Sequence, residues 1–388
     1  MRFFLIAGEP SGDALGAALM AGLRQMHPDV EFTGVGGPLM QAEGMESQFP
    51  MDELSVMGLA EVLPKYRHLK RRIRECADAV LADPPDALIT IDSPDFCLRV
   101  ARLVKNASDI RTVHYVAPTV WAWRSKRAAK MAKVIDQVLA LFPFEPPYME
   151  AEGMRCDFVG HPVVAQQQAT DAEVSAFRAE HGLQEDEKFL LVLPGSRLGE
   201  VGRLAPVFGA ALDPVHARHP GLKVVLPAAG PVAARVEELT KDWPVQPIIL
   251  DPRGKAKDAV QAQKRAAFSA AHLALAASGT VSLELAAAKT PMVIAYDMNW
   301  ISRRLISRML KIDTVTLVNI VSDTRTVPEF LGEACTPEAI SEGLLTLLHD
   351  EAAMQAQLAA EAETMQRLGQ GGEAPGLRAA KAVLDGLQ

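Results

Sequence analysis

The sequence has few aromatic residues and few cysteines, and it lacks any long apolar run. Aromatic side chains make up 5% of its 388 residues. The four cysteines (Cys76, Cys97, Cys156 and Cys335) are scattered, which disfavours structural zinc and a disulfide framework and fits a reducing cytoplasm. Without a stretch of about 18 apolar residues, no membrane-spanning helix is expected. A secretory signal is not expected either, because acidic Glu9 interrupts the first apolar run.

Basic residues are fewer than acidic ones overall, although they are locally concentrated. The net charge of −8 argues against nucleic-acid binding. Residues 64–74, 123–133 and 300–311 nevertheless carry six, five and four basic residues. Such clusters indicate either solvated helix faces or contact with an anionic ligand or surface at defined places.

Short apolar runs alternate with longer helical patterns, and this order occurs twice. Such runs, separated by helices, are typical of parallel strands covered on both faces. We expect strands at 3–7, 31–35, 87–91, 111–116, 137–142, 157–159, 188–193, 222–226, 246–250, 272–276, 292–296 and 315–318. The end of the chain shows helical patterns at 337–348, 351–366 and 377–387. The sequence therefore predicts an α/β protein of two doubly wound, Rossmann-like domains that face each other across a cleft.

The pattern changes over near residues 160–171, which sets the expected domain boundaries. We expect an N-terminal domain over 1–165 and a C-terminal domain over 166–350. Helices over 351–388 should pack back on the N-terminal domain or on a partner subunit. Because ligands of such sheets bind outside the carboxyl ends of the strands, the loops that follow the predicted strands are the candidate sites.

The loop after the first predicted strand combines glycines with polar residues. Its candidate binding residues are Gly8, Ser11, Gly12 and Asp13. Glycine lets the backbone approach a ligand, and the start of the following helix favours an anion or a polar sugar. The loop matches neither G-x-G-x-x-G nor a P-loop. Ser11 or Asp13 could instead simply cap the helix.

Asp92 stands at the carboxyl end of the predicted strand 87–91. A carboxylate at such a position is costly unless it is paired, caps a helix or has a function. A general base and a helix cap both remain open for Asp92, whereas Asp95 has the pattern of an ordinary helix start. His114 and His161, at or just past strand ends, are expected to be core or supporting groups because no partner stands at metal-ligand spacing.

Two loops in the second half have the composition of a diphosphate site. Gly195 and Ser196 precede Arg197, whose forked donors suit a diphosphate unless they pair with Glu200. The second loop holds Ser278, Gly279 and Thr280, with Glu284 about one turn later as a candidate contact for ribose hydroxyls. An acidic residue in a first turn is also favoured by the helix dipole alone. Since the sequence contains no Asp-x-Asp motif, we expect neither a metal nor a cofactor, and Arg197 and helix dipoles should meet the diphosphate charge.

Residues 59–73 have the apolar spacing of an amphipathic helix whose other face carries the first basic cluster. Two interpretations remain open: a helix that docks in a lipid headgroup region, and an ordinary core-facing helix. The candidate membrane-facing residues are Leu59, Val62, Leu63, Tyr66 and Leu69.

Taken together and in order, the motifs resemble the lipid-A-disaccharide synthase family from residue 3 to about 320. They are A-G-E-x-S-G-D (7–13), M-G-L-x-E-V-L (57–63), I-D-x-P-D-F (91–96), H-Y-V-x-P-x-V-W-A-W-R (114–124), L-P-G-S-R (193–197) and A-S-G-T (277–280). The resemblance implies a glycosyltransferase-B architecture and an enzyme of lipid A and lipopolysaccharide biosynthesis in a Gram-negative bacterium. It would transfer a sugar from UDP-2,3-diacylglucosamine to 2,3-diacylglucosamine 1-phosphate with inversion, forming a β-1′,6 linkage and releasing UDP.

The resemblance also implies roles for individual residues. Asp92 matches the family's essential aspartate, Arg197 its essential arginine and Glu284 its acidic nucleotide contact. Asn319 matches an asparagine near the uridine diphosphate, and Trp123 of the aromatic motif is expected among the substrate contacts. The chain departs from the family pattern at Cys97, at Val318 and at Ala165-Gln166, which puts secondary contacts in question.

The resemblance implies an N-terminal domain that faces acceptor and membrane, and a C-terminal domain that binds the UDP-sugar. It further implies a cytoplasmic protein held peripherally at the inner membrane, and a homodimer with exchanged C-terminal segments. The rival interpretations are another UDP-GlcNAc enzyme of the same architecture, such as an undecaprenyl-linked transferase or a 2-epimerase, and a non-catalytic nucleotide-sugar binding protein. UDP release that depends on a diacyl sugar phosphate separates the first group, and an intact Asp92 and Arg197 argue against the second.

Overall fold

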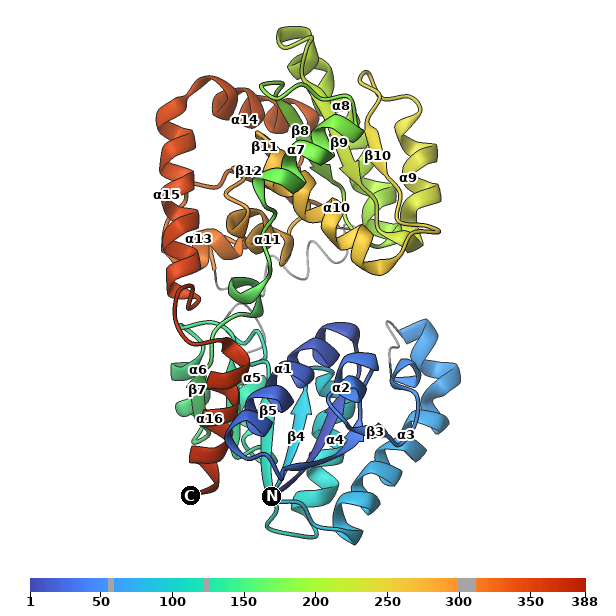
Figure 1. The fold of residues 1–388 in the computed structure, drawn as a ribbon, viewed down its shortest axis with the longest axis vertical. Coiled ribbons are helices and arrows are strands. Elements are labelled where there is room, and N and C mark those ends of the chain that lie inside the picture. The colour runs from blue at the N-terminus through green and yellow to red at the C-terminus, as the bar shows by residue number, and fades with distance from the viewer. Residues whose placement is uncertain (55–58, 122–125, 299–311) are drawn as a thin grey trace. The chain divides into compact units, whose positions relative to one another are not determined.

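The computed structural model describes residues 1–54, 59–121, 126–298 and 312–388, with the backbone alone at 59–65. The chain divides into two compact units (Figure 1). The first contains residues 1–165 together with 368–388, and the second contains residues 166–367.

The first unit is built on a seven-stranded parallel sheet in the order β3-β2-β1-β4-β5-β6-β7. Its strands are β1 (Arg2–Ala7), β2 (Glu31–Val35), β3 (Glu46–Ser47), β4 (Ala87–Ile91), β5 (Arg111–Tyr115), β6 (Gln137–Ala140) and β7 (Arg155–Phe158). Its helices are α1 (Pro10–Met26), α2 (Pro38–Ala42), α3 (Leu59–Ala82), α4 (Pro94–Lys105), α5 (Lys126–Met131), α6 (Pro146–Glu150) and α16 (Pro375–Leu387), with 3-10 turns η1 (Met51–Glu53) and η2 (Pro162–Ala165). The chain reverses its direction across the sheet between β1 and β4, which are hydrogen-bonded neighbours.

The second unit repeats this architecture on a six-stranded parallel sheet in the order β10-β9-β8-β11-β12-β13. Its strands are β8 (Phe189–Leu193), β9 (Lys223–Pro227), β10 (Ile248–Leu250), β11 (Leu273–Ala276), β12 (Met292–Tyr296) and β13 (Glu329–Leu331). Its helices are α7 (Asp171–Glu180), α8 (Leu198–Arg218), α9 (Ala233–Thr240), α10 (Lys257–Ala270), α11 (Val281–Ala287), α13 (Leu317–Ser322), α14 (Pro337–His349) and α15 (Glu351–Arg367), with 3-10 turns η3 (Gly230–Val232) and η4 (Gly332–Ala334). Here the reversal falls between β8 and β11.

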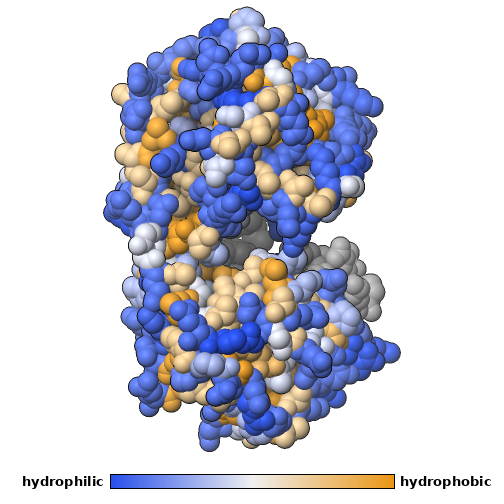
Figure 2. All heavy atoms as spheres, viewed as in Figure 1, coloured by the Kyte–Doolittle hydropathy of each residue, from blue (hydrophilic) through white to orange (hydrophobic). Residues whose placement is uncertain are grey.

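The central strands form because their side chains are buried on both faces of each sheet. All five residues of β4 and of β8 are buried, and both strands are continuous apolar or β-branched runs. Helices cover the two faces (Figure 1), and hydrophilic residues cover most of the visible face of the second unit, with apolar residues scattered among them (Figure 2). The prediction of two doubly wound α/β sheets is confirmed.

The C-terminal helix α16 packs against α1 in the first unit, where the two lie side by side in Figure 1. Glycines allow this close approach. A Cβ on Gly22 would come within 2.7 Å of the Gly376 carbonyl oxygen, and a Cβ on Gly376 within 2.5 Å of the Ala18 oxygen. Gln137 of β6 also donates to the Ala382 carbonyl at 2.7 Å. The C-terminal helices therefore do not form one body, because α15 belongs to the second unit and α16 to the first.

One predicted strand is wrong, and two short strands were not predicted. Residues 315–318 are β-branched or apolar, but Thr316 is the N-cap of α13. The Glu329 carboxylate accepts hydrogen bonds from the backbone N–H groups of Val315 and Thr316, which holds this segment out of the sheet. The strand beside β12 is instead β13, and β3 extends the first sheet beyond β2.

Candidate active-site residues

In the first unit, the candidate site residues lie where β1 and β4 end. These strands pair up to Ala7 and Ile91, so the loop that begins at Gly8 and the turn at Asp92 leave the sheet side by side. This is the switch point of the sheet, the place where ligands of doubly wound folds bind. Gly8 is required here, because a Cβ would lie 2.5 Å from the Ser93 hydroxyl oxygen.

Asp92 and Ser93 both adopt left-handed backbone conformations, with φ of 50° and 42°. Such conformations cost about 1–3 kcal/mol per non-glycine residue, so the surrounding structure must hold them. The Asp92 N–H donates to the Tyr115 carbonyl of β5 at 3.0 Å, and α4 begins directly after the turn at Pro94. Strained turns of this kind concentrate at functional sites.

The Asp92 carboxyl group has the environment of a general base. Burial raises its pKa above the ordinary value, and a hydrogen bond from the Ser93 backbone opposes the shift. A base with a raised pKa accepts a proton more readily near neutral pH. Helix α4 has Ser93 rather than Asp92 at its N-cap, and Ser93 makes no capping bond through its side chain. The geometry therefore favours the general-base interpretation over the helix-cap interpretation.

The loop after β1 contains both exposed and structural residues. Ser11 is exposed at the start of α1, whereas Gly8 and Gly12 are buried, Gly8 beside Ser93 and Gly12 beside Ile91 of β4. Asp13 is also buried, and its carboxylate accepts hydrogen bonds of 2.9–3.0 Å from the backbone N–H groups of Gly37, Leu39 and Met40. Both carboxylate oxygens thus join α1 to the start of α2. Asp13 therefore supports the loop in this structure, and its role in substrate binding stays a prediction.

In the second unit, the candidate site residues lie where β8 and β11 end. Gly195 has a φ of 113°, and a Cβ there would lie 2.8 Å from the Glu200 carboxylate. Ser196 is exposed beside it. The Arg197 side chain is 64% exposed, and its Nη1 lies 3.4 Å from Glu200 Oε1. Since an exposed ion pair of this length contributes little, Arg197 remains available for an anionic ligand.

The loop after β11 presents small polar groups at the adjacent strand end. Ser278 is half-buried, and Gly279 and Thr280 are exposed. Gly279 has a φ of 153°, and its carbonyl accepts a hydrogen bond from Ser282 Oγ at 2.9 Å, which fixes the turn into α11. The Glu284 carboxylate, one turn further, pairs with Lys264 of α10. An anionic ligand and a hydroxyl-rich one are both compatible with this combination.

Asn319 is held inside the second unit. It is 1% exposed. Its amide nitrogen donates to Thr314 Oγ1 and to the Val327 carbonyl, and its oxygen accepts from the Val327 N–H at 3.0 Å. The side chain thus joins α13 to the segment before β13. Asn319 therefore stabilises this part of the second unit, and its contact with a nucleotide stays a prediction.

Three further residues lie near the strand ends of the second unit and were not predicted as site residues. Tyr296, at the end of β12, donates its hydroxyl to Glu200 Oε1 at 3.5 Å, and burial raises the pKa of this tyrosine. Glu200 thereby lies between Arg197 and Tyr296, while Lys264 pairs with Glu284. Tyr296 is the last residue of a strand that the sequence predicted correctly. Its position at the carboxyl end of that strand could therefore have identified it as a candidate site residue. The contact of Lys264 with Glu284, twenty residues away, could not be recognised in the sequence.

Helix α3 confirms the predicted helix at 59–73 but divides its proposed apolar face. Tyr66 is 48% exposed, whereas Leu69 packs against the core of the first unit. The side chains of Leu59, Val62 and Leu63 lie outside the described residues, as do Trp123 and the basic residues of 300–311. Of the candidate membrane-facing residues that can be placed, only Tyr66 faces outward.

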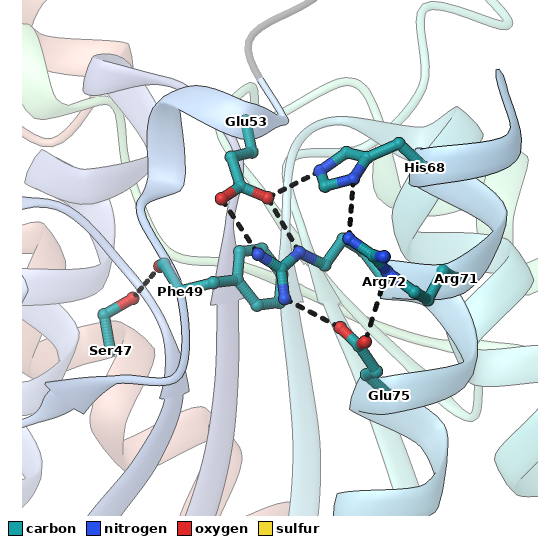
Figure 3. Close-up of polar contacts among 7 residues, drawn as sticks. All are labelled: Ser47, Phe49, Glu53, His68, Arg71, Arg72 and Glu75. Carbon is teal, nitrogen blue, oxygen red and sulfur yellow. Dashed lines mark hydrogen bonds and ion pairs between the residues drawn. The ribbon is translucent and has the colours of Figure 1, made fainter. Parts of the chain in front are cut away.

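Part of the positive charge of the basic cluster on α3 is neutralised by Glu53 of η1. Figure 3 shows Glu53 of η1 between His68 and Arg72, with Arg72 Nε and Nη2 at 2.7 and 2.9 Å from the two Glu53 oxygens. The bonds from Arg72, and then from His68, lower the pKa of Glu53 to about 2. The Arg72 guanidinium also lies 4.2 Å from the centre of the Phe49 ring. Arg72 therefore anchors α3 to η1, and Arg67, Lys70 and Arg74 remain exposed.

The two expected histidines are buried core groups. His114 Nδ1 lies 2.7 Å from Thr90 Oγ1, and His161 Nδ1 accepts from the Val163 N–H at 3.2 Å. Burial lowers the pKa of each imidazole to about 4. Across the described ranges, His, Cys, Asp and Glu side chains form no group of three or more that could hold a metal ion. None of the helices in the same ranges has the length and apolar content needed to cross a membrane.

Solved structures with the same fold bind uridine nucleotides. The chain superposes on a Staphylococcus aureus MnaA–UDP structure with a TM-score of 0.67 and 14% identity, over 98% of this chain and 94% of that one. It superposes on the UDP-GlcNAc 2-epimerase of Neisseria meningitidis bound to UDP-GlcNAc with a TM-score of 0.64 and 13% identity, over 100% and 99%. Similarity at this level of identity concerns the fold. The fold and the loops at both switch points define an α/β protein of the glycosyltransferase-B type.

Proteins of similar sequence identify the family to which the chain belongs within this fold class. A family model described as lipid-A-disaccharide synthetase matches residues 3–380. A lipid-A-disaccharide synthase of Ruegeria pomeroyi is 65% identical over 100% of this chain and 96% of its own length, and one of Rhodospirillum centenum is 48% identical over 99% and 94%. The chain belongs to the lipid-A-disaccharide synthetase family, as its motifs predicted.

Proposed function

We propose that the protein transfers 2,3-diacylglucosamine from UDP-2,3-diacylglucosamine to the 6-hydroxyl of 2,3-diacylglucosamine 1-phosphate. The products are the β-1′,6-linked disaccharide 1-phosphate and UDP. Family membership supports this reaction. The structural observation that carries it is the strained Asp92–Ser93 turn at the switch point of the first sheet, which holds a carboxyl group of raised pKa at a ligand-binding edge.

In this mechanism Asp92 acts on the acceptor. The acceptor hydroxyl donates its proton to the Asp92 carboxylate as the oxygen attacks the anomeric carbon, on the face opposite the leaving UDP. One C–O bond forms, the bond from the anomeric carbon to the diphosphate breaks, and the configuration inverts. Burial helps because it raises the basicity of the carboxylate toward neutral pH.

The second unit acts on the donor. Arg197, exposed at the end of β8, meets the negative charge that develops on the departing diphosphate. Gly195 and Gly279 let backbone N–H groups approach the phosphates, and Ser196, Ser278 and Thr280 supply hydroxyls. Glu284 accepts from the ribose hydroxyls, with its carboxylate oriented by Lys264. The mechanism requires both units to contribute to one catalytic cycle.

Both proposed substrates carry acyl chains, so we further propose that the protein works peripherally at the cytoplasmic surface of the inner membrane. Tyr66 and the exposed basic residues of α3 (Arg67, Lys70 and Arg74) support this part of the proposal. Each basic residue near an anionic lipid surface contributes about 1 kcal/mol to binding. A homodimer that exchanges C-terminal segments would place a partner's α16 on the surface of α1 that this chain's own α16 covers.

The test is an assay with radiolabelled UDP-2,3-diacylglucosamine and unlabelled acceptor. We expect labelled disaccharide 1-phosphate, and UDP release that requires the acceptor. In Asp92→Asn, turnover should fall by roughly two to four orders of magnitude, the range for loss of a general base. UDP release without acceptor would favour a 2-epimerase-like enzyme, and binding of the donor without any turnover would favour a non-catalytic binding protein.

A further inference from the structure

Glu145 is a buried carboxyl group that the proposed mechanism does not use. It follows β6 as the N-cap of α6 and is 2% exposed. Its Oε2 accepts hydrogen bonds from the backbone N–H groups of Leu141 at 3.1 Å and Phe142 at 3.0 Å. Its Oε1 accepts from the Trp121 indole N–H at 3.4 Å. One carboxylate therefore links the chain that leaves β6 to an aromatic side chain 24 residues earlier.

The environment of Glu145 makes this link costly. Burial raises the pKa of Glu145 to about 7, and the hydrogen bonds from Phe142, Trp121 and Leu141 oppose the shift. These three donors are all neutral. A buried carboxylate held only by neutral donors is unfavourable for folding compared with an apolar side chain of the same size. A buried carboxylate of this kind is therefore expected where its hydrogen bonds position residues of a functional site.

The link to Trp121 constrains the segment between β5 and Trp121. Val116, directly after β5, has a φ of 84°, which is a strained conformation for a β-branched residue. The Val116 N–H donates to the Leu139 carbonyl of β6 at 3.0 Å, which holds the start of the segment. The Glu145–Trp121 bond holds its other end. Residues 116–121 are thus fixed at both ends to β6 and to the chain that follows it.

This segment lies beside the Asp92 turn. Strand β5 is the hydrogen-bonded neighbour of β4, and the Asp92 N–H bonds to Tyr115, the residue before Val116. Because neighbouring strands are about 4.8 Å apart, the ends of β4 and β6 lie about 10 Å apart across the sheet. The segment 116–121 leaves the sheet between them. Its position therefore decides the shape of the carboxyl edge next to the proposed base.

An aromatic layer gives this position rigidity. The Trp121 and Phe144 rings meet edge to face with centroids 5.0 Å apart, and Phe144 stacks on Phe142 at 5.4 Å. Phe142 in turn contacts His161 at 5.4 Å, whose imidazole stays neutral because burial lowers its pKa to about 4. The hydrogen bond from Trp121 to Glu145 sets the indole within this layer.

We propose that Glu145 is a positioning residue for the acceptor side of the site. It holds the Trp121 indole, and through it the segment 116–121, beside Asp92. The inference rests on the proposed function, because it assigns the segment to the acceptor that Asp92 deprotonates. It predicts that loss of the Glu145–Trp121 bond weakens acceptor binding and leaves donor binding in the second unit unchanged.

The experiment compares steady-state kinetics of the full-length wild type with Glu145→Ala, Glu145→Gln and Trp121→Phe, varying acceptor and donor in turn. Loss of the carboxylate should raise the KM for acceptor about tenfold, as expected for a hydrogen bond to a charged group, with an unchanged KM for donor. Glu145→Gln, which keeps one acceptor oxygen, should lie between. Trp121→Phe should have the same selectivity, and adding Glu145→Gln to it should have little further effect.

Thr112→Val is the matched control. Thr112 lies at the opposite, amino end of β5 and donates its hydroxyl to the Val134 carbonyl at 2.9 Å. Its loss should lower the melting temperature without changing the KM for acceptor. Equal acceptor KM in the wild type and both Glu145 variants, or a rise in both KM values that Thr112→Val reproduces at equal loss of stability, would overturn the proposal. Absence of transfer by the wild type would instead refute the proposed function.

Discussion

Glu361 of α15 offers a test of how buried polar groups limit the stability of this fold. The side chain is 1% exposed, and neither carboxylate oxygen has a hydrogen-bond partner within the described residues. Burial raises its pKa well above the ordinary value, which favours the protonated form in the folded chain. On the same helix, Thr364 donates to the Val318 carbonyl and Arg367 to the Val321 carbonyl.

Replacing Glu361 by methionine, which has a similar length, should stabilise the protein. An unsatisfied buried polar group costs about 1–3 kcal/mol, and methionine removes that cost while it fills the space. For a unit of this size, the gain corresponds to a rise in melting temperature of about 2–4 °C per kcal/mol. Glu363→Met is the matched control, because Glu363 lies on the same helix with a 45% exposed side chain that pairs with Arg367. We expect the control to change stability by less than about 0.5 kcal/mol.

The same burial of Glu361 should make the stability of the protein depend on pH. Below the pKa of the unfolded chain, Glu361 is protonated in both states and its ionisation affects neither. As pH rises, the unfolded chain ionises first while the folded chain keeps the proton, so the wild type loses stability until the folded pKa is passed. The advantage of Glu361→Gln over the wild type should therefore be small at pH 4 and grow toward pH 8.5, measured by thermal unfolding. An advantage that is constant with pH, or a destabilised Glu361→Met, would refute the assignment of an unpartnered, protonated carboxyl group.

Three further predictions concern the candidate site of the first unit and α3. Because burial raises the pKa of Asp92, the acid limb of kcat/KM should lie at a higher pH than an ordinary aspartate gives, and Asp92→Asn should remove it; an acid limb that persists in the residual activity would assign it to another group. Gly8→Ala should lower activity at least about tenfold by displacing Ser93, since the added Cβ would lie 2.5 Å from its hydroxyl oxygen; wild-type kinetics would show that the turn adapts. Tyr66→Ser should weaken co-sedimentation with anionic vesicles at an unchanged melting temperature, whereas Leu69→Ser, which removes a side chain packed on the core, should lower the melting temperature; a Tyr66→Ser variant that binds vesicles normally would contradict the proposed role of α3.

The central strands could be predicted from the sequence because burial on both faces leaves a continuous apolar run. The expected strands 31–35, 87–91 and 292–296 match the structure at both ends. The edges could not be predicted in the same way. Strand β3 has only two residues, Glu46 and Ser47, and β13 is half-buried, so neither has a run long enough to recognise. Residues 315–318 have the right composition for a strand, but their backbone groups bond to Glu329.

The candidate site was predictable to the level of loops but not of individual contacts. A motif places Asp13 and Asn319 near a ligand-binding edge, and it does not distinguish a side chain that touches the ligand from one that supports the loop. The partners of Asp13 lie 24–27 residues away in α2 and the turn before it, and those of Asn319 include Val327 in the segment before β13. Which role a polar residue plays depends on such distant partners, and only the folded chain brings them together.

Backbone strain supplies a criterion that the sequence lacks. Among the described residues, five other than glycine have left-handed φ values: Asp92, Ser93, Val116, Lys289 and Asp323. Lys289 and Asp323 follow α11 and α13, where a left-handed residue commonly ends a helix. The other three have no such role, and they stand at the ends of β4 and β5, two adjacent strands of one sheet. Each costs about 1–3 kcal/mol, and backbone bonds to the next strand hold two of them, Asp92 to Tyr115 and Val116 to Leu139. Within the described residues, the left-handed residues other than glycine that do not end a helix therefore lie at one sheet edge, beside a carboxyl group of raised pKa, and this supports the proposal that the chemistry of the first unit takes place there.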